Sequence, residues 1–289
     1  MNWERFLHID RRIIFLTLAL VILVPLIFPF EQPMNIQKPT KSLFDAIEAI
    51  DPERQVLMIS TDYVPQTEAE NQPMTIALIR HAMARHVRVL MISLYIESAG
   101  LANAAMQQVI EEFNSRATSP ADSVVYGRDI AFLGWQPPPI VPILSMGRSI
   151  SAIYPTDFFG TATDSLPVMR GVRNYDQVGI ICAISGGSSP LWFVQFAQTR
   201  FGVKVGAGCT AVSAPDFYPY FATGQFSGII GGMKGAAEYE TLVENTYHVD
   251  GRRRAMEGMG SQSLAHLLIM AFVVVGNIAY FAGKRRKAQ

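Results

Sequence analysis

The sequence contains few of the residues that most often build catalytic or metal sites. Its 289 residues include two cysteines and five histidines, and 17% of the chain is charged. It has no HxH, HExxH or paired-cysteine spacing of the kind that binds zinc. Lys and Arg together number 24, as do Asp and Glu, so no excess positive charge is present to neutralise nucleic-acid phosphates. We therefore expect no metal, no other cofactor and no nucleic-acid partner.

Apolar residues, in contrast, are abundant, and they are concentrated near the two ends of the chain. Residues 13–30 and 264–282 contain no Asp, Glu, Lys or Arg. A helix of about 20 residues spans the roughly 30 Å hydrocarbon core of a bilayer, so these runs predict two transmembrane helices. A buried core helix is the alternative for each. A cleaved signal peptide is a further alternative for the first run, but that run is longer than a signal h-region and has no small-residue cleavage site.

The basic residues that flank the apolar runs predict the orientation of the chain. Lys and Arg are more numerous on the outer flanks (Arg5, Arg11, Arg12, Lys284, Arg285, Arg286, Lys287) than on the inner flanks (Lys38, Lys41, Arg252, Arg253, Arg254). The positive-inside rule then places residues 1–12 and 283–289 in the cytoplasm and residues 31–263 outside it, in a two-pass protein of the inner (cytoplasmic) membrane. The cluster at 252–254 argues for the inverted topology, unless it meets lipid headgroups or an acidic partner.

Between the apolar runs, residues 51–250 have the pattern of one α/β domain. A juxtamembrane linker or helix is expected at 31–50 and a membrane-proximal linker at 251–263. Apolar runs predict strands at 55–60, 87–94, 129–133, 178–184 and 203–207, and helices are expected at 74–85, 101–116, 140–153 and 190–200. Because continuously apolar strands are typical of a parallel sheet covered on both faces, we predict a three-layer, Rossmann-like α/β/α domain.

Polar residues that follow the predicted strands are candidates for a ligand site, because ligands bind at the carboxyl ends of parallel strands. The clearest segment is Ser185–Pro190, a Gly-Gly turn before a helix expected to begin at Pro190 with Ser189 as its cap. Free N–H groups in such a turn can hold an anion. The candidates for ligand binding are Asp62, Glu97, Ser185, Gly186, Gly187 and Ser188. A purely structural turn is the alternative, since neither a P-loop lysine nor a GxGxxG fingerprint is present.

The sequence gives little support for nucleophilic catalysis, and we assign no catalytic residue. None of the five histidines is expected near the serines and cysteines of the predicted ligand edge. A Ser/Lys dyad that uses Lys204 or Lys234 is the remaining hydrolase alternative. Cys182 and Cys209 are expected to be buried free thiols, although an extracytoplasmic domain would permit a disulfide.

Small residues recur at intervals of four between residues 224 and 235, at Gly224, Gly228 and Gly232 and also at Gly231 and Gly235. On a helix, this spacing produces a smooth stripe that another helix can approach closely. The stripe is either packed on the sheet inside the domain or an interface between subunits. Polar residues at or in the second apolar run favour contact with another helix, because they are unfavourable against lipid: Gln262, His266 and Asn277.

Several short motifs resemble those of a group of membrane-anchored bacterial α/β proteins without an assigned function. They are Thr61-Asp62-Tyr63, Tyr126-Gly127-Arg128-Asp129, Leu133-Gly134, Thr156-Asp157 with Gly160, Tyr220 to Gly224-Gln225, and the stretch from Gly235 to Glu240. The resemblance covers most of the chain. It implies two anchors and an α/β domain, and no activity comes with it.

These observations favour a non-enzymatic subunit of a membrane protein assembly. In this interpretation the lipid bilayer is one partner, and the extracytoplasmic domain forms a homo-oligomer or binds other membrane subunits. The alternative is a domain that binds an anion or small molecule, or one that acts like a serine hydrolase, through the turn at 185–190.

Overall fold

The computed structural model describes residues 10–287, except residues 29, 31, 32, 121 and 250. The chain divides into two compact units. Met34–Ala255 forms the larger unit, and the described parts of Met1–Pro33 and Met256–Gln289 form the smaller one.

A six-stranded sheet forms the centre of the larger unit. Its strands are β1 (Val56–Asp62), β2 (Val89–Ser93), β3 (Ile130–Trp135), β4 (Val178–Ser185), β5 (Val205–Cys209) and β6 (Ile229–Gly231). They lie in the order β3-β2-β1-β4-β5-β6, and every neighbouring pair is parallel. The order reverses direction between β1 and β4, as in doubly wound folds. The predicted α/β class and parallel sheet are therefore confirmed.

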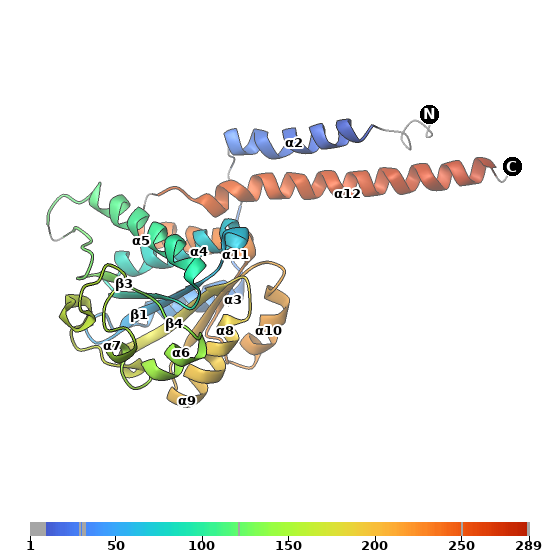
Figure 1. The fold of residues 1–289 in the computed structure, drawn as a ribbon. Helices are drawn as coiled ribbons and strands as arrows, with labels where there is room; N and C mark the ends of the chain where they lie inside the picture. Colours follow the sequence, from blue (N-terminus) through green and yellow to red (C-terminus); the bar gives the residue numbers. More distant parts are fainter. Residues whose placement is uncertain (1–9, 29, 31–32, 121, 250, 288–289) are drawn as a thin grey trace. The chain divides into compact units, whose positions relative to one another are not determined.

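Helices cover both faces of the sheet, which explains why the strands are apolar throughout (Figure 1). On one face, α4 packs between α5 and α11, and α3 packs against α11 and β6. These helices are α3 (Lys38–Glu48), α4 (Glu68–Ala84), α5 (Ala99–Asn114) and α11 (Gly232–Tyr247). The other face carries α6 (Ile140–Met146), α7 (Ile150–Ile153), α8 (Ser189–Trp192), the π-helical η6 (Phe193–Gln198), α9 (Thr199–Phe201) and α10 (Ala214–Ala222).

The five predicted strands are all present, and their ends differ from the predicted ends by at most two residues. The segment expected to be one small-residue helix is different. It is divided among the turn after α10, the short strand β6 and the start of α11. Gly224 and Gly232 have φ values of 77° and 62°, which no continuous helix contains. The single helix face expected from the glycine spacing is therefore wrong.

The long connection between α7 and β4 is ordered by its own hydrogen bonds and contains the short turns η3 (Thr163–Ser165), η4 (Pro167–Met169) and η5 (Tyr175–Gln177). The buried carboxylate of Asp157 accepts hydrogen bonds from the N–H groups of Phe159 and Thr161 and from the hydroxyl of Tyr126. The N–H of Phe158 donates to the carbonyl of Phe132 in β3 at 2.9 Å. The connection thus covers the outer edge of β3, where the chain would otherwise expose an unpaired strand.

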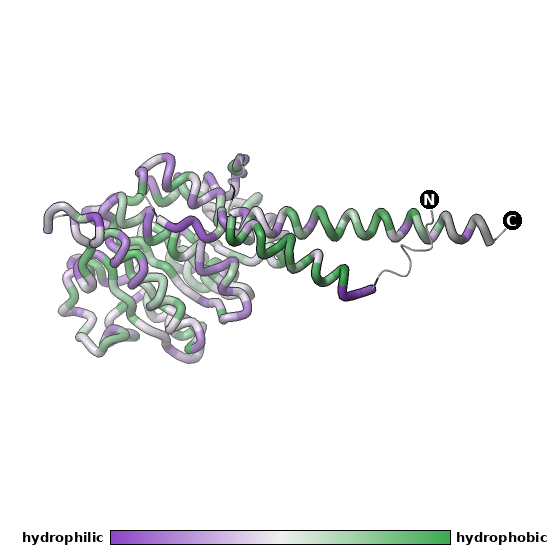
Figure 2. The backbone as a smooth tube through the Cα atoms, turned by 90° about the horizontal axis from the view of Figure 1, so that it is seen from above, coloured by the Kyte–Doolittle hydropathy of each residue, from purple (hydrophilic) through white to green (hydrophobic). Residues whose placement is uncertain are grey.

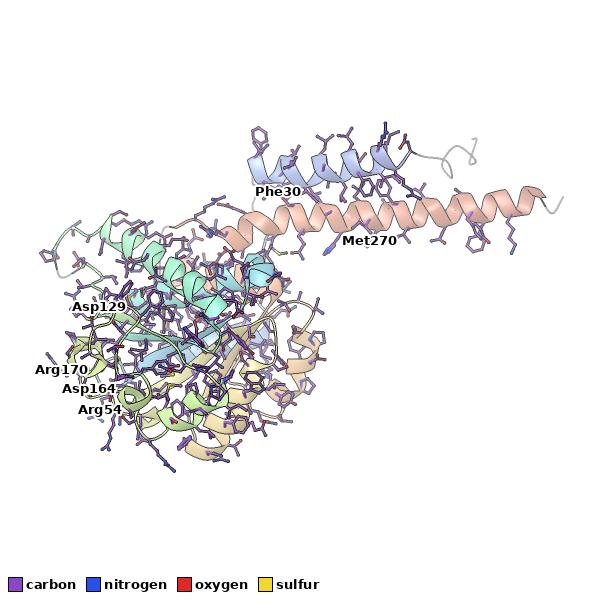
Figure 3. The ribbon with its side chains drawn as sticks, in the orientation of Figure 1. Phe30, Arg54, Asp129, Asp164, Arg170 and Met270 are labelled. Carbon is purple, nitrogen blue, oxygen red and sulfur yellow. The ribbon has the colours of Figure 1, made fainter. Side chains whose placement is uncertain are left out.

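In the smaller unit, α2 (Arg11–Ile27) and α12 (Arg254–Lys287) run side by side and antiparallel (Figures 1 and 2). The Ser261 hydroxyl donates to the carbonyl of Ile22 at 3.0 Å. Apolar side chains along both helices are exposed, as Met270 illustrates in Figure 3. In the part of the chain that the structure describes, one helix is long and apolar enough to cross a membrane, over Arg254–Phe281. Helix α2 has 17 residues, so a two-pass arrangement stays a prediction.

Candidate functional site

The carboxyl ends of β1 and β4 meet where the strand order reverses, and polar residues gather there. Asp62 at the end of β1 lies in register with Ser185 at the end of β4. The adjacent turns supply Gly186, Gly187 and Ser188, so the structure brings most of the predicted ligand-binding residues to one place. Glu97 is exposed in η2 (Ile96–Ser98) after β2 and takes no part in the hydrogen bonds of this cluster.

The Asp62 carboxylate lies inside the protein, with an exposure of 3%. It accepts hydrogen bonds from the Ser60 hydroxyl (2.9 Å to each oxygen), the Ser189 hydroxyl (2.8 Å) and the Leu94 N–H (2.8 Å). Burial raises the pKa of Asp62 to about 6, although these hydrogen bonds act in the opposite direction. The carboxylate therefore joins β1, the end of β2 and the start of α8, and its acceptor capacity is used within the chain.

The turn after β4 is held by similar internal contacts. The Ser185 hydroxyl donates to the carbonyl of Asp62 at 2.9 Å and accepts the N–H of Gly187 at 2.9 Å. Helix α8 begins at Ser189, not at Pro190, and the Ser189 hydroxyl bonds to Asp62 and caps no helix. The expected cap is therefore wrong. The Gly187 N–H is therefore engaged within the turn and is not offered to an anion.

The lysines considered for a Ser/Lys dyad are elsewhere. Lys204 directly precedes β5, so it lies at the amino end of the sheet, opposite Ser185. Lys234, in the first turn of α11, forms an ion pair with Glu238. Both cysteines are free and buried, and burial raises the pKa of the Cys209 thiol to about 12 and that of Cys182 above its usual range. None of these groups provides an activated nucleophile.

Exposed apolar side chains surround this edge. Five of them lie on the segments that directly follow β2, β3 and β5, and the most exposed, Val212, is 87% accessible: Ile96, Ile140, Val141, Val212 and Tyr218. Val125, at 43%, precedes β3 and lies at the opposite edge. Because the loops at the carboxyl ends of parallel strands share one edge, these side chains belong to the same face of the domain.

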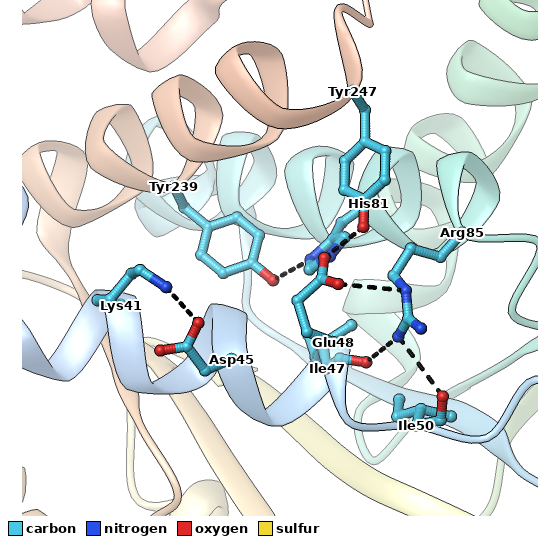
Figure 4. A network of polar contacts seen from close by, with 9 residues as sticks. All are labelled: Lys41, Asp45, Ile47, Glu48, Ile50, His81, Arg85, Tyr239 and Tyr247. Carbon is cyan, nitrogen blue, oxygen red and sulfur yellow. Dashed lines mark hydrogen bonds and ion pairs between the residues drawn. The ribbon is translucent and has the colours of Figure 1, made fainter.

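A second polar cluster, which the sequence did not reveal, joins α3, α4 and α11 (Figure 4). His81 in α4 is fully buried and stacks on Phe44. Its Nδ1 lies 2.7 Å from the Tyr239 hydroxyl, and its Nε2 lies 2.8 Å from Oε1 of Glu48. The Tyr247 hydroxyl also donates to Glu48. Glu48 and Tyr239 are 33 and 158 residues from His81 in the sequence, so no local pattern could have indicated the cluster.

The order carboxylate, imidazole, hydroxyl is that of a catalytic triad, but the environment is different. Burial lowers the pKa of His81 to about 4, while the Glu48 carboxylate opposes the shift, so the imidazole is neutral at pH 7. Burial alone would raise the pKa of Glu48, but hydrogen bonds from Tyr247 and His81 lower it. Tyr239 is fully buried and its pKa is raised well above the ordinary value, so no substrate can reach its hydroxyl. The cluster stabilises the packing of three helices.

The residues predicted to form an interface divide into two groups. Gly228 and Gly235 are buried inside the domain, and a Cβ on Gly228 would lie 2.2 Å from the backbone nitrogen of Leu43. Gly228 and Gly235 thus serve packing inside the domain, Gly231 lies at the end of β6, and Gly224 is exposed. Gln262, His266 and Asn277 lie on α12. Asn277 is exposed, and its amide donates to the carbonyl of Val273 in the same helix at 2.8 Å.

Within the described ranges, no group of three or more His, Cys, Asp or Glu side chains could hold a metal ion. Comparison with known proteins finds no matching family model, no matching curated protein and no matching solved structure.

Proposed function

We propose that this chain is a membrane-anchored, non-enzymatic subunit whose α/β domain binds a second copy of itself or another membrane protein through the carboxyl edge of its sheet. The observation that carries the proposal is the set of exposed apolar side chains on that edge, led by Val212. Apolar side chains gathered on one face are typical of protein interaction sites.

The internal hydrogen bonds of the same edge support a binding role over a chemical one. The Ser185 hydroxyl donates to the Asp62 carbonyl, and the Ser189 hydroxyl donates to the Asp62 carboxylate. They fix the loops that present the apolar side chains, which suits a rigid docking surface. For the same reason, we do not favour anion binding or ester hydrolysis at the turn of residues 185–190.

The membrane part of the proposal rests on α2 and α12. Both are apolar, they pack antiparallel, and their large side chains are exposed in the structure, as suits helices that contact lipid. We infer a two-pass protein of the cytoplasmic membrane. The excess of basic residues on the outer flanks supports cytoplasmic termini and an extracytoplasmic domain.

The experiment is gentle extraction of the full-length protein from its native membrane, followed by native mass determination. We expect a defined assembly, either of this chain alone or with one other membrane protein. Val212→Lys is expected to dissociate it, because a charge would be buried in the apolar contact. Val125→Lys, which changes an exposed valine at the opposite edge, is the matched control. A monomeric wild-type protein, or an assembly that survives Val212→Lys, would refute the proposal.

A further inference from the structure

A pocket of about 350 Å³ lies at the amino edge of the sheet, opposite Asp62. It is formed by the C-terminal ends of α4, α5 and α11 and by the segments that precede β2 and β3. Its walls include the apolar side chains of Met83, Phe113 and Val124. A pocket of this size accommodates a small metabolite.

Two histidines with unusual backbone conformations line this pocket. His86 and His248 have φ values of 53° and 52°, and no other non-glycine residue in the described part of the chain has a positive φ. His86 follows the C-terminus of α4, where the Val87 N–H bonds to the carbonyl of Ala82 and the His86 N–H to that of Met83. His248 caps the C-terminus of α11, and its N–H bonds to the carbonyl of Glu244. Glycine suits such positions best, because it has no Cβ to clash in the left-handed region.

Compensation of the helix dipoles does not explain these two histidines. A basic side chain anywhere in the last turn interacts favourably with the C-terminal carbonyls, and it needs no left-handed backbone. His86 and His248 are 162 residues apart in sequence, and each occupies a helix end where glycine would be less strained. Both imidazoles nevertheless line one pocket. This coincidence indicates that the side chains are used there.

Three arginines add positive charge to the lining. The guanidinium of Arg88 is held by the carbonyls of Val168 and Arg170, at 2.9 and 2.7 Å, and that of Arg128 pairs with Asp129. The guanidinium of Arg116 makes no hydrogen bond or ion pair with the described residues. It interacts electrostatically with Glu112, whose carboxylate is already paired with Arg80.

The pocket also contains two carboxylates, and both are engaged. The Asp122 carboxylate accepts hydrogen bonds from the Thr118 and Ser119 hydroxyls, and that of Asp129 pairs with Arg128. The Arg116 guanidinium therefore stays available for an anion from outside the chain.

We propose that this pocket binds a small organic phosphate with an apolar body. The Arg116 guanidinium pairs with the phosphate, the imidazoles of His86 and His248 donate hydrogen bonds to it, and the apolar body packs on Phe113 and Met83. The proposal does not depend on the assembly proposed above, because the pocket and the carboxyl edge lie on opposite edges of the sheet.

The test uses full-length protein in phosphatidylcholine nanodiscs and isothermal titration with phenyl phosphate, with phenol as the uncharged counterpart. We expect saturable binding of phenyl phosphate and none of phenol. Arg116→Gln should weaken binding about tenfold or more, because it removes a charge-assisted pair. Arg173→Gln, an exposed arginine outside the pocket, is the matched control and should leave binding unchanged. Equal binding of both probes, or no saturable binding of phenyl phosphate, would overturn the proposal.

His86→Gly separates ligand binding from folding. Since glycine relieves the left-handed backbone, the variant is expected to unfold at a higher temperature than the wild type while it binds phenyl phosphate more weakly. A more stable variant with unchanged affinity would show that the imidazole does not contact the ligand, and would contradict the proposal.

A phospholipid headgroup carries the same charged group as a soluble phosphate ester, so a second arm identifies the source. Nanodiscs that contain phosphatidic acid should reduce the apparent affinity for phenyl phosphate if the natural ligand is a headgroup. They should leave it unchanged if the ligand is a soluble metabolite. With either source, Arg116→Gln should abolish the difference in binding affinity between phenyl phosphate and phenol. A variant that keeps this difference would contradict the proposed phosphate site.

Discussion

Replacing Asp62 by Asn should remove a specific pH dependence of folding stability. The Asp62 carboxyl is buried, and its pKa is raised from the ordinary 3.8 to about 6. Between these two pH values the folded protein binds the proton more tightly than the unfolded chain does, so the free energy of unfolding decreases as the pH rises. An amide keeps an acceptor for the Leu94 N–H and does not titrate, so the variant lacks this decrease.

The magnitude follows from the pKa difference. A shift of about two pKa units, at about 1.36 kcal/mol each, corresponds to about 3 kcal/mol. The difference in unfolding free energy, Asp62→Asn minus wild type, should therefore increase by about this amount between pH 4 and pH 7. Below the ordinary pKa of an aspartate the carboxyl is protonated in both states, and its titration contributes no difference.

The assay is urea unfolding of the full-length protein in mild detergent at a series of pH values. Fluorescence of Trp135 and Trp192, which both belong to the larger unit, reports on the domain. The wild type is measured in parallel, so that titration of all other groups cancels in the difference. A difference that stays constant with pH would show that Asp62 titrates normally. A difference that decreases would show that the hydrogen bonds from Ser60, Ser189 and Leu94 outweigh burial.

Three further predictions concern other parts of the molecule. His81 has a pKa lowered to about 4, so the difference in unfolding free energy, wild type minus His81→Gln, should fall by about 3 kcal/mol as the pH drops from 6.5 to 4 in the same urea assay. Gly228→Ala should lower the free energy of unfolding by about 3 kcal/mol, because its Cβ would meet the Leu43 backbone, whereas Gly100→Ala, with open space in α5, should raise it by up to about 1 kcal/mol. Asn277→Leu should leave membrane insertion intact, as measured by extraction resistance, and weaken assembly in native mass determination; unchanged assembly would limit the amide to its contact within α12.

The strands could be predicted because their residues contact helices on both sides and must be apolar at every position. β1 and β2 are buried throughout, so an uninterrupted apolar run marks each of them. β6 has three residues, Ile229–Gly231, and follows a glycine-rich stretch, so its apolar signal is too short to distinguish it from a helix. The strand that the sequence analysis missed is thus the shortest one.

The candidate site was predictable as a location but not as a set of bonds. Asp62 and Ser185 come together because parallel strands end at the same edge. The hydroxyl of Ser189 turns inward to Asp62, and this depends on the exact packing of α8 against β4. The contact of His81 with Tyr239 depends on how α4 and α11 pack, which only the complete fold determines.

The cluster around His81 has a mechanical consequence. Helix α3 begins four residues after the larger unit starts, and α11 ends eight residues before the unit stops, so these helices adjoin the two places where the chain enters and leaves it. Glu48 of α3 and Tyr239 of α11 both bond to His81 of α4, and Tyr247 of α11 bonds to Glu48. Tension applied through the two ends of the domain would therefore shear a few buried polar contacts between helices before it reached the hydrogen bonds of the sheet.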